Sequence, residues 1–272
     1  MTKAYVETTV LADALLKPGP RATAAKAAIG RFDQSLLPVY SIKEFKAGPL
    51  NRYVWFHGKL VQTKSWEKSL EQLRRMGANP YRGRWLSTGV EELEAAAHRR
   101  RKVTLGQLVM KYGELATEDR FMCDSYRLTL GNLIRTAWKH RRKLTTAIVG
   151  ELSCYSEGEI TEERELFEFG ELKCCPKDEC ALAEELRRNL ESLKKLRDAV
   201  KAQSPKQENL KRLKVLREFI RVPKQKLSPK QCVALGDAIF AFCCPSDATI
   251  LTTNLTDIRP LADALGKRAE GP

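Results

Sequence analysis

The sequence contains no apolar run long enough to cross a membrane, and its N-terminus lacks the pattern of a signal peptide. These two absences predict a cytoplasmic protein with no membrane partner. Histidine is also scarce, with three residues in 272. None of the three stands in a pattern typical of a Ser/His/Asp catalytic site. The chemistry of this chain is therefore expected to rest on other side chains.

Cysteine is present, but not in the pattern of a disulfide scaffold. Eight cysteines in a long, lysine-rich chain are expected to be mostly free thiols in a reducing compartment. Four of them gather at Cys154, Cys174, Cys175 and Cys180. Zinc sites usually show paired cysteines at short spacing, whereas the nearest useful pair here, Cys175 and Cys180, is separated by four residues. The cluster is poor evidence for zinc.

Charge is what the sequence has in excess, and it is unevenly distributed. The formal net charge of +14 and the pI near 9.5 indicate a polyanionic partner, for which nucleic acid is the first expectation. Residues 81–148 hold 14 Lys/Arg against 7 Asp/Glu, and residues 187–230 hold 15 against 4. Between them, residues 151–185 hold 3 against 12. This acidic block is interpreted as a solvated loop, with docking onto the basic segments as the alternative.

Two dense basic clusters stand out, at residues 98–102 and 139–143. Basic side chains neutralise phosphates without reading sequence, so both clusters are candidate nucleic-acid contacts. Solvated helix faces are an equally good interpretation. The expected nucleic-acid-binding residues are Arg99, Arg100, Arg101, Lys102, Lys139, Arg141, Arg142 and Lys143.

The two ends of the chain show alternating strand and helix patterns. Apolar, β-branched runs predict strands at residues 3–11, 36–40 and 247–252, and helical patterns occupy residues 10–16, 22–32, 228–243 and 257–265. Ser228-Pro229 is a preferred helix entry, with the serine as N-cap and the proline at the first helical position. This alternation predicts an α/β fold with a parallel sheet covered on both faces.

The middle of the chain is predicted to be mainly helical. Leucines recur at helical spacing over residues 182–196 and again over residues 210–220, and Ser204-Pro205 separates the two runs. We expect a helical hairpin whose leucines are packing residues. The expected organisation is an α/β part at residues 1–60, a helical basic insertion at 61–221 and the rest of the α/β part at 222–272.

Four acidic residues lie where strand-like runs end or on the helices beside them. They are Glu7, Glu44, Asp237 and Asp257. Ligands of open α/β folds bind at the carboxyl ends of strands, and hard cations such as Mg²⁺ and Mn²⁺ prefer carboxylate oxygens. A site of this kind activates water and neutralises a phosphodiester. For Glu44 a structural alternative is a capping box with Ser41 as N-cap.

The motifs that carry these acids resemble a known family. Residues 6–11 with Glu7, Gly236-Asp237-Ala238, and residues 250–254 followed by Asp257 look like the opening and closing motifs of PIN-domain proteins, which include the VapC-type toxin ribonucleases. The resemblance covers about the first 50 and last 45 residues. It implies a three-layer α/β/α fold with a central parallel sheet, and a Mg²⁺- or Mn²⁺-dependent acidic site that cuts RNA. It also implies an antitoxin or another protein as a partner.

The family's site residues transfer position by position. Glu7 matches the first acidic position, Glu44 the second and Asp237 the third, while Asn254 and Asp257 both fit the fourth. Thr252, Thr253 and Asn254 are expected to support the site by orienting a water or a phosphate. Two departures stand out. The first position is usually aspartate, and Asp237 follows Glu44 by 193 positions.

Two further hypotheses compete with a ribonuclease. The first is a catalytically weak or inactive PIN-like module that binds RNA or DNA or assembles with protein. The glutamate at position 7 motivates it, because a longer side chain would shift the metal. The second makes the leucine-patterned hairpin at residues 181–221 a docking surface for another chain or for a second copy of this one.

Overall fold

The chain forms an α/β protein built on a parallel sheet. The computed structural model describes residues 1–17, 19–77, 110, 113, 118–150, 160–169, 180–224 and 226–272. Within them, five parallel strands pair in the order β3-β2-β1-β6-β7. The strands are β1 (Lys3–Val6), β2 (Gln34–Pro38), β3 (Ala147–Val149), β6 (Thr249–Leu251) and β7 (Arg268–Glu270). The expected α/β class with a parallel sheet is confirmed.

Side chains alternate between two cores, one on each face of the sheet. On β1, Ala4 and Val6 belong to one buried cluster and Tyr5 to the other. On β6, Leu251 belongs to the first cluster and Ile250 to the second. Successive strand residues point to opposite faces, so strands buried on both sides must be apolar throughout. This explains the short continuous apolar runs of both strands.

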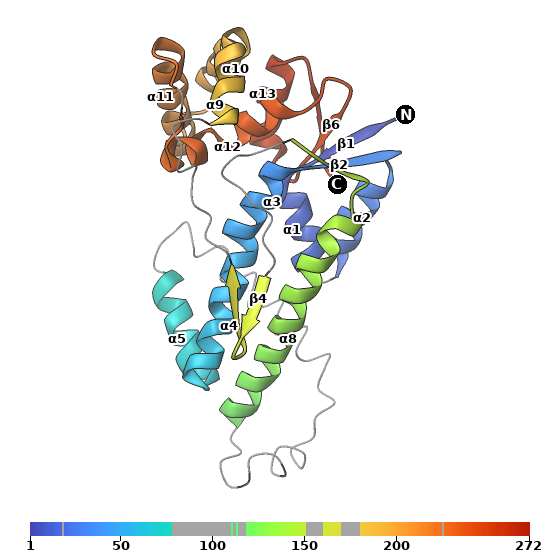
Figure 1. The fold of residues 1–272 in the computed structure, drawn as a ribbon, viewed down its shortest axis with the longest axis vertical. Helices are drawn as coiled ribbons and strands as arrows, with labels where there is room; N and C mark the ends of the chain where they lie inside the picture. Colours follow the sequence, from blue (N-terminus) through green and yellow to red (C-terminus); the bar gives the residue numbers. More distant parts are fainter. Residues whose placement is uncertain are drawn as a thin grey trace.

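Helices cover both faces of the sheet (Figure 1). The first core is covered by α1 (Thr8–Leu16), α2 (Pro20–Gly30), α4 (Asn51–Thr63), α5 (Trp66–Gly77) and α8 (Glu118–His140). The second is covered by α9 (Ala181–Arg188), α10 (Leu190–Ala202), α11 (Gln207–Arg221), α12 (Pro229–Cys243) and α13 (Leu255–Ala264). Helix α3 (Val39–Phe45) follows β2 and contributes to both cores.

Several local predictions are confirmed and two are wrong. Ser228 caps α12 through a reciprocal capping box with Gln231, and α10 and α11 form the expected hairpin. The first strand, however, ends at Val6 rather than at residue 11, because Glu7 caps a helix that begins at Thr8. The expected cap at Ser41 is also wrong.

Ser41 lies inside α3, which begins at Val39 directly after Pro38. The Ser41 hydroxyl is buried and donates a hydrogen bond of 3.0 Å to the Val6 carbonyl oxygen. It therefore ties α3 to the end of β1. The capping-box alternative for Glu44 is therefore wrong, and the position of the Glu44 side chain has another cause.

Part of the segment expected as an insertion is integrated into the sheet. Strand β3 comes from within residues 61–221 and pairs with β2 at the edge, and α9 to α11 pack in the second core. Helix α8 instead runs beside α4, away from the sheet (Figure 1). Residues 61–221 thus contribute a strand to the sheet and helices to both cores.

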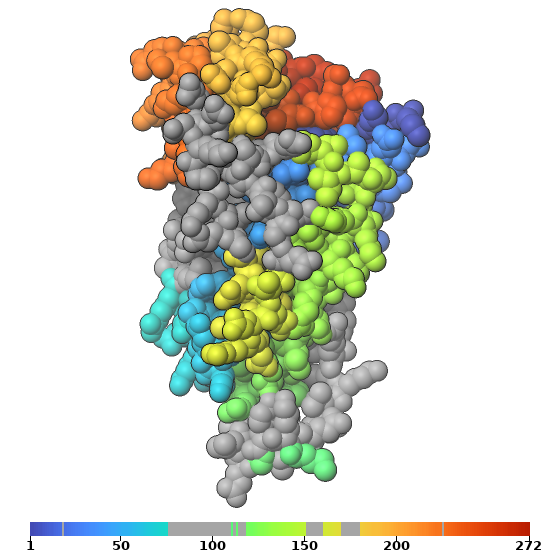
Figure 2. All heavy atoms as spheres, viewed as in Figure 1, coloured from blue at the N-terminus to red at the C-terminus, as the bar shows by residue number. Residues whose placement is uncertain are grey.

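Residues 160–169 of the acidic block form a β-hairpin and not a solvated loop, and residues 181–185 belong to α9. Strands β4 (Ile160–Glu163) and β5 (Leu166–Phe169) pair antiparallel and lie against α8 (Figure 2). Arg135 of α8 donates two hydrogen bonds of 2.7 and 2.8 Å to Glu162, and Arg127 pairs with Glu165 at 2.6 Å. The docking alternative is correct for residues 160–169.

The cysteine cluster of the sequence lies mostly outside the described residues. Cys154, Cys174 and Cys175 lie outside the described residues, whereas Cys180 is a buried free thiol. Of the helices that the structure describes, none combines the length and the apolar character needed to cross a membrane.

Candidate functional site

Three of the four predicted acids gather at the carboxyl edge of the sheet. Glu7 directly follows β1, and its backbone amide donates to the carbonyl oxygen of Leu251, the last residue of the neighbouring β6. Glu44 lies on α3 after β2, and Asp237 lies on α12, whose C-terminus leads into β6. Strand order β2-β1-β6 therefore brings together segments that are far apart in sequence. We call Glu7, Glu44 and Asp237 the acidic site.

Hydroxyl groups hold the buried Glu7 carboxylate. The Glu7 side chain is 7% exposed, and its Oε2 accepts hydrogen bonds from the Thr9 hydroxyl, from the Thr9 amide at 3.1 Å and from the Thr252 hydroxyl at 3.1 Å. Burial raises the pKa of Glu7 to about 7. The Thr9 hydrogen bonds oppose this rise, and the nearby charges of Glu44 and Asp237 add to it.

Glu44 lies beside Glu7 in the same electrostatic environment. Its Oε2 accepts a hydrogen bond of 2.8 Å from the Thr8 hydroxyl. Burial raises the pKa of Glu44, the Thr8 hydrogen bond lowers it, and the Asp237 charge raises it. Gly236 packs against this arrangement, and a Cβ there would stand 3.4 Å from Glu44 Oε1 and 3.6 Å from Tyr40 Oη, which are ordinary van der Waals distances.

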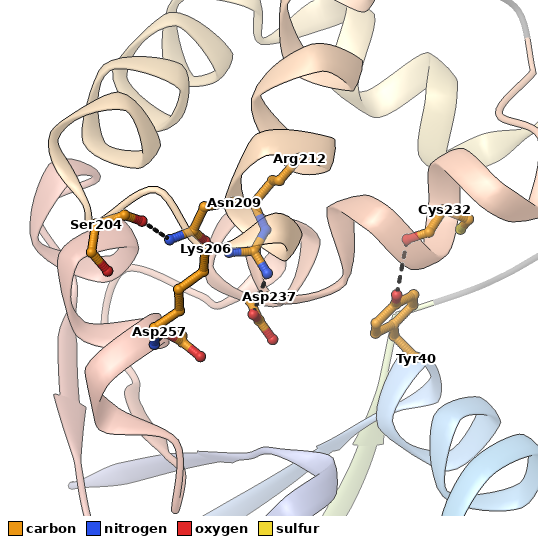
Figure 3. Close-up of polar contacts among 8 residues, drawn as sticks. All are labelled: Tyr40, Ser204, Lys206, Asn209, Arg212, Cys232, Asp237 and Asp257. Atoms are coloured by element: carbon orange, nitrogen blue, oxygen red, sulfur yellow. Dashed lines mark hydrogen bonds and ion pairs between the residues drawn. The ribbon is translucent and has the colours of Figure 1, made fainter. Parts of the chain in front are cut away.

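Asp237 is paired with a cation from the helical hairpin (Figure 3). Its Oδ2 accepts a hydrogen bond from Arg212 Nη2 on α11, and the side chains of Asp237 and Arg212 are 30% and 6% exposed. Arg212 Nη1 donates to Asn209 Oδ1 at 3.2 Å, and Asn209 Nδ2 donates to the Ser204 carbonyl oxygen at 3.1 Å. A buried polar network thus connects the turn before α11 with the acidic site.

Asp257, which lies in the first turn of α13, has a different partner from Asp237. Its Oδ1 accepts a hydrogen bond of 3.0 Å from Lys206 Nζ, again from the hairpin (Figure 3). Of the expected supporting residues, Thr253 has an exposed side chain, and its amide donates to Thr9 Oγ1 at 3.2 Å. The Asn254 amide donates to Thr252 Oγ1 at 2.9 Å. The Thr252 hydroxyl contacts the carboxylate of a predicted acid, whereas the hydrogen bonds described for Thr253 and Asn254 are made by their backbone groups.

The donor set of the acidic site suits a hard divalent cation. Glu7, Glu44 and Asp237 offer carboxylate oxygens, and burial with mutual repulsion disfavours the charged forms of Glu7 and Glu44. A cation would relieve both costs. In the described part of the chain, however, no three His, Cys, Asp or Glu side chains already stand in a metal-holding arrangement. Binding would require the three carboxylates to turn toward one another.

A second polar feature lies between α8 and the β4–β5 hairpin. It is a cavity of about 430 Å³, which we call the basic groove. Its lining residues are Arg135, Trp138, Lys139, Arg141, Arg142, Ile160, Glu162 and Phe167. Three of these residues, Lys139, Arg141 and Arg142, were predicted as nucleic-acid contacts. Lys143 was predicted with them but does not line the groove.

The four cations of the groove have different environments. The Arg135 charge is offset by Glu162. Arg141 is buried, and its guanidinium lies 3.5 Å from the centre of the Trp138 ring, so it stacks on the indole. Lys139 and Arg142 are exposed. The other predicted cluster, Arg99, Arg100, Arg101 and Lys102, lies outside the described residues.

Sequence reasoning missed the residues that surround the acids. Four side chains contact the predicted acids but were not predicted as site residues, namely Thr8, Thr9, Lys206 and Arg212, and Asn209 in turn contacts Arg212. The threonines directly follow Glu7, so their proximity could have been noticed. Arg212 and Asn209 show no signal, because their side chains reach the site only through the packing of α11 on α12.

Comparison with known proteins identifies no relative. No protein-family model, no curated protein and no solved structure matches this chain. Its function is therefore argued from its own residues.

Proposed function

We propose that this chain is a PIN-like, metal-dependent ribonuclease that hydrolyses RNA phosphodiester bonds at the acidic site. The observation that carries the proposal is the meeting of Glu7, Glu44 and Asp237 at the carboxyl edge of a parallel sheet, where ligands of open α/β folds bind. These side chains come from three distant segments, and two of the carboxyl groups are buried with raised pKa values. Burying ionisable groups destabilises the fold, so a structural role alone does not explain the arrangement. Such groups cluster at functional sites.

The residues of the site have separable roles. A bound Mg²⁺ or Mn²⁺ would supply an activated water and neutralise charge on the phosphodiester. Glu7, Glu44 and Asp237 would hold that ion. Thr9 and Thr252 donate hydrogen bonds to the Glu7 carboxylate, and Thr8 donates one to Glu44, so these hydroxyl groups would support the carboxylates behind a bound ion.

The basic groove supports RNA as the substrate class. A chain of net charge +14 attracts polyanions, and exposed Lys139 and Arg142 beside a cavity suit a phosphate backbone. RNA is preferred over DNA because the motifs resemble those of toxin ribonucleases. An antitoxin or a second copy of this chain remains a proposed protein partner, with the hairpin of α10 and α11 as its contact.

A second candidate function is a PIN-like module that binds nucleic acid without cutting it. One observation favours it: Arg212 already pairs with Asp237, and Lys206 already pairs with Asp257. Cations in these positions reduce the negative charge that would attract a metal. A cleavage assay separates the two functions.

The assay compares single-stranded RNA incubated with the purified protein and with an Asp237→Asn variant, in Mn²⁺, Mg²⁺ or EDTA. We expect metal-dependent cleavage that falls by about a hundredfold or more in the variant. Mutating a residue that only hydrogen-bonds to a metal ligand already lowers metal affinity or activity by roughly ten- to a hundredfold. Asp263→Asn is the matched control, because Asp263 is exposed on α13. Equal cleavage by both variants would refute the site, and metal-dependent cleavage by none of the proteins would favour the binding module.

A further inference from the structure

Arg212 enters the acidic site from a helix that the PIN-like motifs do not include. It lies on α11, and the fork of its guanidinium is fixed on two sides, by Asp237 at Nη2 and by Asn209 at Nη1 (Figure 3). Asn209 is itself 5% exposed and is held by the Ser204 carbonyl oxygen. The orientation of the guanidinium is therefore set by the protein before any ligand binds.

The Nε–H donor of this guanidinium is buried and unsatisfied in the described part of the chain. Arg212 is 5% exposed, and its buried Nε–H has no hydrogen-bond partner among the residues that the structure describes. Buried donors on charged groups are nearly always hydrogen-bonded, because an unsatisfied one destabilises the folded state. The Asp237 carboxylate accepts from Nη2, whereas it makes no described hydrogen bond with Nε. This Nε–H is therefore a donor able to bind a ligand oxygen.

A phosphate oxygen has the chemistry that this donor requires. Guanidinium groups bind phosphate with directed hydrogen bonds and keep their charge at any working pH. The carboxylates of the acidic site repel a phosphodiester, so a positive group fixed among them is needed where the substrate approaches. Arg212 is the buried cation that contacts this site.

We propose that Arg212 is a substrate-binding residue of the acidic site, whose Nε–H donates to a non-bridging oxygen of the substrate's phosphodiester once the side chains that bury it move aside. This inference rests on the proposed function, because it places the scissile phosphate of RNA beside Glu7, Glu44 and Asp237. It assigns the hairpin a role in the site. The hairpin of α10 and α11 then supplies a phosphate contact to the edge of the sheet.

The test compares Arg212→Lys with Arg217→Lys in the full chain. Both variants keep the charge of α11, and Arg217 is exposed on the same helix. Affinity for a short single-stranded RNA is measured by fluorescence anisotropy in EDTA, and KM and kcat are measured with Mn²⁺. We expect Arg212→Lys to weaken RNA affinity and to raise KM by roughly tenfold, because lysine cannot place a donor at the Nε position. Arg217→Lys should match the original protein.

A second variant guards against loss of folding. Asn209→Ala frees one side of the guanidinium while leaving the Asp237 pair, and it should show the same changes to a smaller extent. Circular dichroism and thermal melting confirm that each variant is folded. Unchanged RNA affinity and KM in Arg212→Lys would overturn the proposal, and so would increased cleavage, since Arg212 would then block the site. If the original protein cuts no RNA, the proposed nuclease fails, while the affinity loss in EDTA still decides the role of Arg212.

Discussion

The acidic site takes its side chains from three distant segments of the chain, whereas the basic groove takes four cations from the end of one helix and the turn after it. Glu7, Glu44 and Asp237 meet because β2, β1 and β6 are neighbours in the sheet. Arg135, Lys139, Arg141 and Arg142 meet because they follow one another over two helical turns. The difference teaches that the acidic site depends on the whole fold, and that the groove depends mainly on local sequence.

The two features also differ in how their charge is balanced. Glu7 is buried with hydroxyl and amide donors and, among the described residues, no cation beside it, so its ionised form is disfavoured. The cations of the groove include exposed side chains, whose charge water solvates. Stability should therefore respond to pH through the acidic site, and RNA affinity should respond to salt through the groove.

The largest expected effect is on the pH dependence of stability. The pKa of Glu7 is raised from 4.5 to about 7, so the folded state binds a proton that the unfolded state has released between these values. The stability that Glu7 contributes is fully present below pH 4.5 and is lost as pH rises through 7. Integrated over this window, the loss approaches about 3 kcal/mol.

Glu7→Gln removes this titration, since glutamine resembles the protonated glutamate in shape. Denaturant unfolding in EDTA from pH 5 to pH 8 should show the variant gaining up to about 3 kcal/mol over the original protein. Glu270→Gln, at an exposed position, is the control. Parallel pH profiles for all three proteins would mean that the acidic site does not carry the charge described here.

A smaller effect is expected in the basic groove. Lys139→Ala should weaken single-stranded RNA binding a few-fold and should reduce the slope of log affinity against log salt by roughly 0.7, the value for one phosphate contact. Lys143→Ala is the matched control, because Lys143 is exposed nearby but does not line the groove. If both variants lose the same affinity, net charge rather than the groove binds RNA, and the contrast between the two features disappears.

Much of the fold could be predicted from sequence, since its signals are local. Apolar runs predicted the parallel sheet, Ser228-Pro229 predicted the start of α12, and leucine spacing predicted the hairpin. The end of β1 was missed because Val10 and Leu11 continue the apolar run, while the Glu7 side chain caps a helix within it. Apolar periodicity does not reveal where a cap interrupts it.

The site was predictable only in part, for the same physical reason. The three acids could be named because each follows a strand or lies on a helix next to one. Arg212 and Asn209 could not, because they reach Asp237 only when α11 packs on α12. Asp257 was predicted with the acids, and its pairing with Lys206, like the pairing of Asp237 with Arg212, could not be predicted. A cation contributed by a distant helix changes the chemistry of a carboxylate, and sequence spacing does not record it.

The central claim is that Glu7, Glu44 and Asp237 form one metal site, and Mn²⁺ binding tests it most directly. Electron paramagnetic resonance measures free Mn²⁺ during titration of the original protein, Glu44→Gln, Asp237→Asn and the control Asp263→Asn, without any need for cleavage. The account predicts a saturable Mn²⁺ site that the original protein and Asp263→Asn share and that both site variants weaken by about tenfold or more. Equal Mn²⁺ binding by all four proteins, or no binding by the original protein, would contradict it.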